Sequence, residues 1–152
     1  MQNENIETIL KKAAAKENGT YLLYKNAADR VKDVYTKSIL QNFAEEELKH
    51  KEIIENFNTE TLETIEMKID EPSRQGISEF LTGTDTDLSH DPDIKDVLIY
   101  AAKREKKAFA FYDNMSTLVA DPELKKLFTW LAQEESKHKE NIEALFWEVM
   151  YR

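Results

Sequence analysis

Two glutamate–histidine pairs are the residues of this sequence best suited to chemistry. Glu47 precedes His50 by three positions, and Glu135 precedes His138 by the same interval. On a helix, residues three apart lie on one face, so each carboxylate and its imidazole can reach a common point. One such pair arises easily by chance in a glutamate-rich chain, but two in matching positions indicate a site that uses both groups.

An internal repeat of 88 residues relates the two pairs. When positions 10–54 are compared with positions 98–142, 17 of the 45 residue pairs are identical. The repeat also aligns two further glutamates, Glu17 and Glu105, which each lie 30 residues before the glutamate of the next pair. Each half of the chain therefore supplies two glutamates and one histidine.

Long helices must position these residues. The 152 residues include only three glycines and three prolines, and few segments alternate with the period of a strand. Apolar residues recur instead at helical spacing. Helices are expected over about 5–31, over about 34–57, from about 93, and after the Asp121-Pro122 start signal.

Each half is predicted to be an antiparallel helical hairpin, in which facing residues are equidistant from the turn. The midpoint of Glu17 and Glu47 is residue 32, and the midpoint of Glu105 and Glu135 is residue 120. Both midpoints fall between predicted helices. The glutamates of each half are therefore expected to be level with each other, roughly 22 Å along the helix from the turn.

Two amphipathic hairpins can cover each other's apolar faces, whereas one cannot cover its own. The sequence predicts a single all-α domain over 1–152, a ferritin-like four-helix bundle of two helical hairpins. Hairpin 1 is expected over about 5–57 and hairpin 2 over about 93–151. A long crossover over 58–92 joins them, with a helical turn expected at 77–81.

Such a bundle brings four carboxylates and two imidazoles together in an apolar core. Four ionised carboxylates there are costly without counter-charge, and two divalent cations balance them in formal charge. Glutamates from two helices with Glu-x-x-His from two others form the di-iron carboxylate pattern, and this ligand set suits iron or manganese. A structural core of ion pairs, or a decayed site, is the alternative.

Composition excludes other classes of function. The sequence contains no cysteine, which excludes thiolate metal sites, iron–sulfur clusters and a cysteine nucleophile. Thirty acidic residues outnumber 21 basic ones, so no basic stripe is present for nucleic acid. No apolar run reaches the ~20 residues of a membrane span, and the N-terminus lacks a signal-peptide pattern. We expect a cytoplasmic protein with neither nucleic-acid nor membrane partners.

The motifs around these residues resemble those of the rubrerythrin-type branch of the ferritin-like superfamily. They are A-K-E-x-x-x-Y at Glu17, A-E-E-E-L-K-H ending at His50, R-E-K-K-A-F-x-F-Y around Glu105, and A-Q-E-E-S-K-H ending at His138. The resemblance covers nearly the whole chain outside 58–92. It implies that a centre of two iron ions is held by Glu17, Glu47, His50, Glu105, Glu135 and His138.

The resemblance also implies a reaction with hydrogen peroxide or dioxygen, in response to oxidative stress, and a homodimer. Two departures from the family pattern matter. Typical members carry a Cys₄ domain, so here we expect a separate electron-donor protein. Typical members also carry an extra ligating glutamate one turn beyond Glu105, where this chain has Ala108, and its repeat partner is Thr20. The six-residue set is therefore symmetric and closer to bacterioferritin-type centres.

The predicted function is that of an enzyme, a non-haem di-iron oxidoreductase that reacts with peroxide or dioxygen. A ferroxidase or iron-binding protein is one alternative. A manganese catalase-like activity is another, because ligand type alone does not select iron over manganese. The third is a non-catalytic helical bundle that holds manganese or zinc.

Several neighbouring residues have more than one interpretation. Tyr24 and Tyr112 lie seven residues after Glu17 and Glu105, on the same helical faces. Their hydroxyls would either orient a ligand carboxylate or pass an electron, or the rings would simply pack in the core. Gly19 indicates a π-bulge, a close approach by the crossover, or a tolerated glycine.

The remaining glutamates and aromatic residues near the motifs are expected to be peripheral. The glutamates that flank the motifs point about 100° or more away from the ligand face and are expected to be solvated. They are Glu45, Glu46 and Glu134. The aromatic residues of the last helix would lie in the core or form a dimerisation patch. They are Trp130, Phe146 and Trp147.

Overall fold

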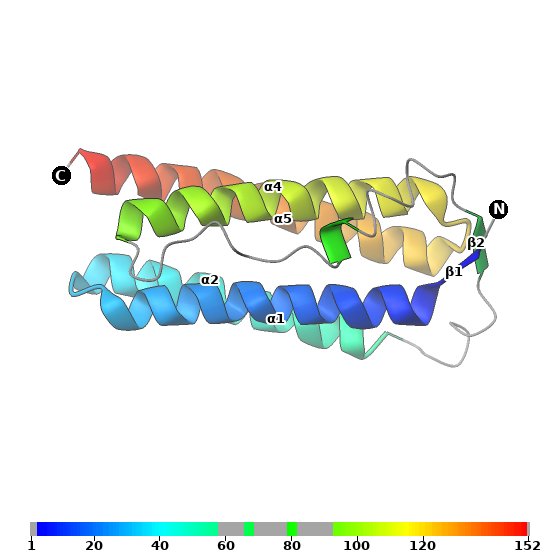
Figure 1. Ribbon diagram of the computed structural model, residues 1–152. Coiled ribbons are helices and arrows are strands. Elements are labelled where there is room, and N and C mark those ends of the chain that lie inside the picture. Colours follow the sequence, from blue (N-terminus) through cyan, green and yellow to red (C-terminus); the bar gives the residue numbers. More distant parts are fainter. Residues whose placement is uncertain (1–2, 58–65, 69–78, 82–92, 152) are drawn as a thin grey trace.

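The computed structural model describes residues 3–57, 66–68, 79–81 and 93–151. Four long helices dominate this part of the chain, and together they confirm the predicted all-α bundle of two hairpins (Figure 1). The helices are α1 (Ile6–Arg30), α2 (Val34–Glu55), α4 (Ile94–Leu118) and α5 (Pro122–Met150).

Aspartate caps begin three of these helices. The side chains of Asp33, Asp93 and Asp121 each accept a hydrogen bond from the backbone N–H three residues later, at 2.9, 2.9 and 3.0 Å. Such a cap satisfies an otherwise orphaned N–H and stabilises a helix by about 1 kcal/mol. Pro122 occupies the first turn of α5, where its missing N–H costs nothing.

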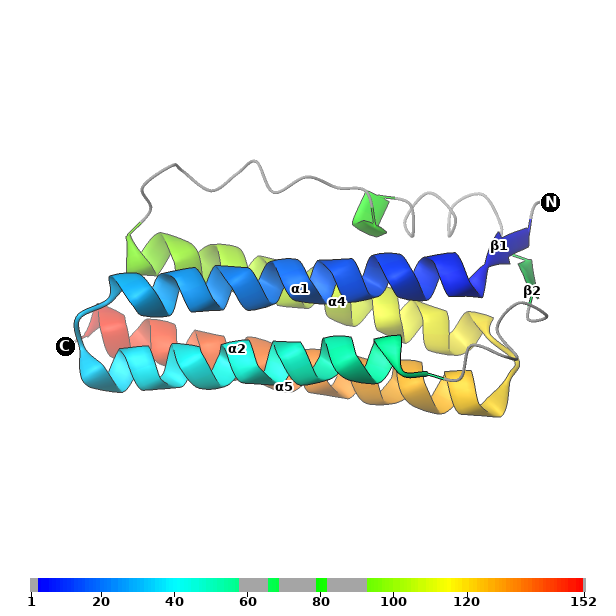
Figure 2. The ribbon, with the colours of Figure 1, turned by 90° about the horizontal axis from the view of Figure 1, so that it is seen from below.

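The hairpins α1–α2 and α4–α5 lie side by side, with α1 next to α4 and α2 next to α5 (Figures 1 and 2). Each helix runs antiparallel to both of its neighbours. The two helices that carry Glu-x-x-His, α2 and α5, are therefore adjacent. The two helices that carry a single ligand glutamate, α1 and α4, are adjacent on the other side of the bundle.

The apolar core consists of two clusters separated along the bundle. In α1, residues 6–14 contribute to one cluster and residues 24–28 to the other, with buried Glu17 between them. In α5, the corresponding stretches are 124–132 and 142–145. A polar layer at mid-bundle therefore has apolar side chains on both sides. Within the described part of the chain, no helix is long and apolar enough to cross a bilayer.

A short antiparallel pairing joins the N-terminus to the crossover. Strands β1 (Asn3–Asn5) and β2 (Glu66–Lys68) are three residues each, too short for an alternating pattern to reveal. Residues 79–81 are helical, in agreement with part of the turn expected at 77–81. Most of the crossover at 58–92 lies outside the described residues.

Candidate metal centre

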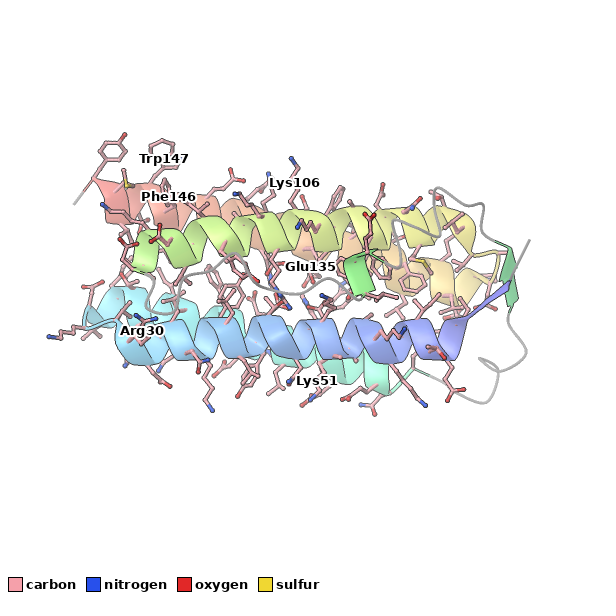
Figure 3. The ribbon with its side chains drawn as sticks, in the orientation of Figure 1. Arg30, Lys51, Lys106, Glu135, Phe146 and Trp147 are labelled. Atoms are coloured by element: carbon pink, nitrogen blue, oxygen red, sulfur yellow. The ribbon has the colours of Figure 1, made fainter. Side chains whose placement is uncertain are left out.

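The polar layer contains the six residues that the sequence singled out as ligands. Each is at most 3 % exposed. In Figure 3, Glu135 extends into the space between the two hairpins at mid-length of the bundle. One residue comes from each of α1 and α4, and two come from each of α2 and α5: Glu17, Glu105, Glu47, His50, Glu135 and His138.

Four of the six converge closely. Glu47, His50, Glu135 and His138 each offer one ligand atom, and these atoms lie within 4.8 Å of one another, a spacing that can hold a metal ion. The two remaining glutamates border this group. Glu17 Oε1 lies 3.8 Å from Nδ1 of His50, and the matching oxygen of the α4 glutamate lies 3.8 Å from Nδ1 of His138.

Two consecutive glutamates of the opposite hairpin contact the ring nitrogens of His138. Its Nδ1 lies 2.8 Å from Oε1 of Glu47, and its Nε2 lies 2.5 Å from Oε2 of Glu46. Both distances are short enough for charge-assisted hydrogen bonds, so α2 holds the ring of an α5 residue at both nitrogens.

His50 occupies the equivalent position but is held more loosely. Its Nδ1 lies 3.4 Å from Oε1 of Glu135, and its Nε2 lies 3.8 Å from Oε1 of Glu134. Its ring stacks on that of His138, with centroids 5.0 Å apart and planes 15° apart, and meets the Trp130 ring edge-on at 5.4 Å. Packing rather than hydrogen bonding therefore restrains His50.

Two glutamates expected to be solvated belong to this arrangement. The Glu46 side chain is 48 % exposed and the Glu134 side chain 23 % exposed, yet each carboxylate faces the Nε2 of a buried histidine. The helical angle places them off the ligand face of their own helix, but the adjacent helix brings a histidine to meet them. The repeat indicated this role, because it aligns Glu46 of the first half with Glu134 of the second. Glu45 is exposed, as expected.

Tyr24 and Tyr112 connect the hairpins at the other two ligands. The Tyr24 hydroxyl donates to Oε1 of Glu105 at 2.6 Å, and the Tyr112 hydroxyl donates to Oε1 of Glu17 at 3.0 Å. Burial, with the nearby carboxylates, raises the pKa of both hydroxyls well above 10.0, so both remain proton donors. Each tyrosine therefore orients a carboxylate of the opposite half.

Crowding of the carboxylates shifts their protonation. Burial, followed by the charges of Glu105 and Glu17, raises the pKa of Glu47 and Glu135 well above 4.5. Burial acts in the same direction on Glu105, but its neighbours Glu135 and His138 outweigh burial and lower its pKa to about 2. The metal-free site therefore retains protons on some carboxyls and negative charge on others.

The pKa values of the two histidines are also shifted in opposite directions. Burial lowers the pKa of His50 and outweighs the neighbouring carboxylates. For His138, burial also acts to lower the pKa, but Glu105 and Glu46 outweigh it and the pKa is raised. The metal-free protein therefore favours a neutral imidazole at His50 and a charged one at His138.

Several buried polar atoms of the site have no hydrogen-bond partner among the described residues. They are Oε2 of Glu47, Nδ1 of His50, and both carboxylate oxygens of Glu135. Leaving a buried polar atom unsatisfied costs about 1–3 kcal/mol. All four atoms are metal ligands by chemical type and face the same cluster, so the residues present fit a bound cation.

Arg104 ties α4 to α1 beside the site. Its Nη2 donates to the carbonyl oxygen of Lys16 at 3.0 Å, and its Nε donates to the hydroxyl of Thr20 at 2.5 Å. A Cβ on Gly19 would lie 2.7 Å from Nη2, so the glycine admits the guanidinium. The close approach expected at Gly19 is thus made by α4, and α1 is an uninterrupted α-helix there.

Comparisons with known proteins agree with this fold. The family model described as rubrerythrin matches residues 8–86 and 96–151, which is most of the chain. Among solved structures, a hypothetical protein from Pyrococcus furiosus is similar, with 23 % identity and a TM-score of 0.64 over 92 % of this chain and 87 % of that chain. At that identity the likeness shows the fold alone. None of the curated proteins matches.

Proposed function

The chain belongs to the rubrerythrin family, and from that premise we propose that it is a non-haem di-iron oxidoreductase that reacts with hydrogen peroxide or dioxygen. The observation that supports this most strongly is the convergence of two carboxylates and two imidazoles, with orphaned ligand atoms, in the core. We assign six residues as ligands of two iron ions: Glu17, Glu47, His50, Glu105, Glu135 and His138.

The bound iron ions would supply the redox chemistry, and the protein would supply geometry, protons and a dry cavity. Tyr24 and Tyr112 hold the carboxylates of Glu105 and Glu17 in place through hydrogen bonds. Metal binding displaces protons from Glu47 and Glu135, because a ligand carboxylate must be ionised. The apolar clusters on both sides of the layer exclude water.

A ferroxidase is the alternative that one observation favours. The two positions where an additional ligating glutamate would break the symmetry of the site are Ala108 and Thr20. Ala108 lies in the first apolar cluster, and the Thr20 hydroxyl donates to the carbonyl oxygen of Lys16 at 3.1 Å. Neither residue adds a carboxylate, so the symmetric set of six also suits iron oxidation without peroxidase turnover.

Anaerobic titration with Fe²⁺ tests the proposal. We expect two ions to bind per chain and to be oxidised when peroxide or air is added, as followed by ultraviolet absorbance. Binding of fewer than two ions, or no oxidation, would overturn the proposal. An added one-electron reductant separates the alternatives, since an oxidoreductase continues to consume peroxide whereas a ferroxidase stops when its sites are filled. The Glu45→Ala variant, at an exposed position, is the control for a changed charge on α2.

A further inference from the structure

A cavity of about 260 Å³ lies on the α1–α4 side of the bundle, and none of the six proposed metal ligands lines it. Its walls come from α1, from α4 and from the short helical turn at 79–81, which Figures 1 and 2 show in green beside these two helices. Three of the six lining residues are cationic, and none is acidic: Lys12, Ala15, Lys16, Gly19, Leu81 and Arg104.

The charge of this cavity is opposite to that of the chain as a whole, which is −9. Lys16 and Arg104 directly precede the buried glutamates Glu17 and Glu105, so they lie about 100° around the same helices. The glutamates are at most 3 % exposed, whereas the two cations are partly exposed. The α1–α4 side therefore presents carboxylates to the core and positive charge to the cavity.

The 88-residue repeat does not account for this cavity. The counterparts of Lys12 and Gly19 in the second half are Tyr100 and Lys107. The second half therefore has neither the lysine one turn before Lys16 nor the glycine over which a guanidinium can lie. The cluster of three cations is a property of one half, whereas the ligand motifs are a property of both.

Independent contacts hold the walls of the cavity in place. The guanidinium of Arg104 donates to the carbonyl oxygen of Lys16 at 3.0 Å and to the hydroxyl of Thr20, and it lies over Gly19. The turn that carries Leu81 is anchored by Phe80, whose ring stacks on that of Phe111 with centroids 4.4 Å apart and planes 13° apart. A cavity whose walls are already ordered loses less freedom when a ligand binds.

We propose that this cavity binds a phosphate group, either as inorganic phosphate or as the monoester of a small metabolite. A guanidinium and two ammonium groups match the charge and the several acceptor oxygens of a phosphate dianion better than those of a single carboxylate. The volume lies just below the range of about 300–1,000 Å³ that is typical for drug-sized ligands, which favours a small molecule. The inference goes beyond the proposed function and does not depend on it.

Calorimetric titration of the full chain with inorganic phosphate tests the inference. The protein is first freed of metal with a chelator, so that phosphate bound to a metal ion is not counted, and the ionic strength is held constant. We expect one phosphate to bind per chain and acetate to show no saturable binding. Arg104→Gln should weaken phosphate binding by about 10-fold or more, because it removes charge-assisted hydrogen bonds. Lys126→Ala removes one positive charge from a 77 % exposed side chain of α5 and should leave binding unchanged.

The Gly19→Ala variant tests the position of the guanidinium without removing any charge. The new Cβ would lie 2.7 Å from Nη2 of Arg104, so the guanidinium must move. We expect phosphate binding to weaken, although all three cations remain. Alanine favours a helix more than glycine does, so the variant should fold, and circular dichroism checks this. If the cations served only to stabilise the fold, this substitution would not change the affinity for phosphate.

The outcomes separate this inference from the proposed function. No saturable binding of phosphate by the wild type would overturn the inference alone, because the titration contains no metal. Equal affinity in the wild type, Arg104→Gln and Gly19→Ala would locate the phosphate elsewhere and would also overturn it. Competition by glycerol 3-phosphate distinguishes the two sources of the group. An affinity at least equal to that of inorganic phosphate identifies a monoester as the ligand, and exclusion of the ester identifies the free ion.

Discussion

The two histidines of the site face equivalent glutamates at different distances. Nδ1 and Nε2 of His138 lie 2.8 and 2.5 Å from the glutamates of α2, whereas the same atoms of His50 lie 3.4 and 3.8 Å from those of α5. The pKa of His138 is raised, because carboxylates outweigh burial, and the pKa of His50 is lowered by burial. A repeat that duplicates ligand types therefore does not duplicate their environment.

The difference comes from neighbours that the repeat does not share. Trp130 meets the His50 ring edge-on at 5.4 Å, and its repeat counterpart is Asn42. Phe43 lies 6.3 Å from His138, between ring centroids, and its counterpart is Leu131. Aromatic rings of different size thus border the two histidines. Because side chains in a core pack closely, these different neighbours change the position that each imidazole ring can adopt.

The comparison extends to the α1–α4 side. Arg104 reaches from α4 to hydrogen-bond α1 over Gly19. The ammonium of its repeat counterpart, Lys16, lies 5.8 Å from the centroid of the Phe80 ring. Substitutions made in matched pairs, one in each half, can therefore separate what the halves share from what they do not.

The largest effect is expected from removing the shared carboxylates together. The Glu47→Ala/Glu135→Ala double variant should lose Fe²⁺ binding, by more than about 100-fold, because each half loses the glutamate of its Glu-x-x-His pair. The single variants should each retain one ion, with unequal affinities. Calorimetry measures both, with Glu45→Ala as the control. Equal residual affinity in the two single variants would contradict the inequality of the halves.

The next effect is on the pH dependence of the metal-free protein. A carboxyl whose pKa is raised on folding stays protonated after the unfolded chain has ionised. Its stability contribution is complete below about pH 4.5 and is lost as the pH rises toward the raised pKa. The free energy of unfolding should therefore fall from pH 5 to 8, and bound Zn²⁺ should abolish the fall.

Matched substitutions sharpen this prediction. Glu47→Gln and Glu135→Gln each remove one titrating carboxyl, so each should flatten the slope of stability against pH. The two histidines act in opposite directions on the stability, because the pKa of His50 is lowered and that of His138 is raised. Urea denaturation across this pH range measures the slope. A slope unchanged in either variant would show that its carboxyl does not titrate there.

A smaller difference is expected between the two tyrosines. Tyr24→Phe removes a 2.6 Å hydrogen bond to Glu105, whose pKa of about 2 keeps it ionised, and should cost about 2 kcal/mol. Tyr112→Phe removes a 3.0 Å bond to Glu17 and should cost about 1 kcal/mol. Urea denaturation of the metal-free variants tests the order. A larger loss of stability in Tyr112→Phe than in Tyr24→Phe would show that the carboxylate of Glu17, in α1, is held more tightly than that of Glu105.

The smallest effect is expected on the α1–α4 side. Arg104→Ala removes two partly buried hydrogen bonds and should cost about 1 kcal/mol of stability. Lys16→Ala keeps the backbone carbonyl that Arg104 uses and removes a cation–π contact worth about 0.5 kcal/mol. Thermal denaturation of the two variants compares them, and equal losses would count against a specific role for Arg104.

Much of the fold and of the candidate site could be predicted from the sequence. Scarce glycine and proline, helical spacing and the Asp121-Pro122 start signal predicted the four helices, and the repeat predicted two hairpins. The same repeat placed six candidate ligand residues at one level of the bundle, where the structure finds them buried. These properties depend on local helix geometry and on equal spacing from a turn, and both follow directly from the positions of residues in the sequence.

The tertiary structure alone decided the rest. Sequence shows which face of its own helix Glu46 occupies, but not that α5 brings His138 to meet it. The sequence likewise could not show that Arg104 would pack over Gly19, or that β1 would pair with β2. Contacts between helices depend on how unlike side chains pack across an interface. For that reason the sequence predicts a symmetric set of six residues, whereas the folded protein gives the two histidines of that set unequal surroundings.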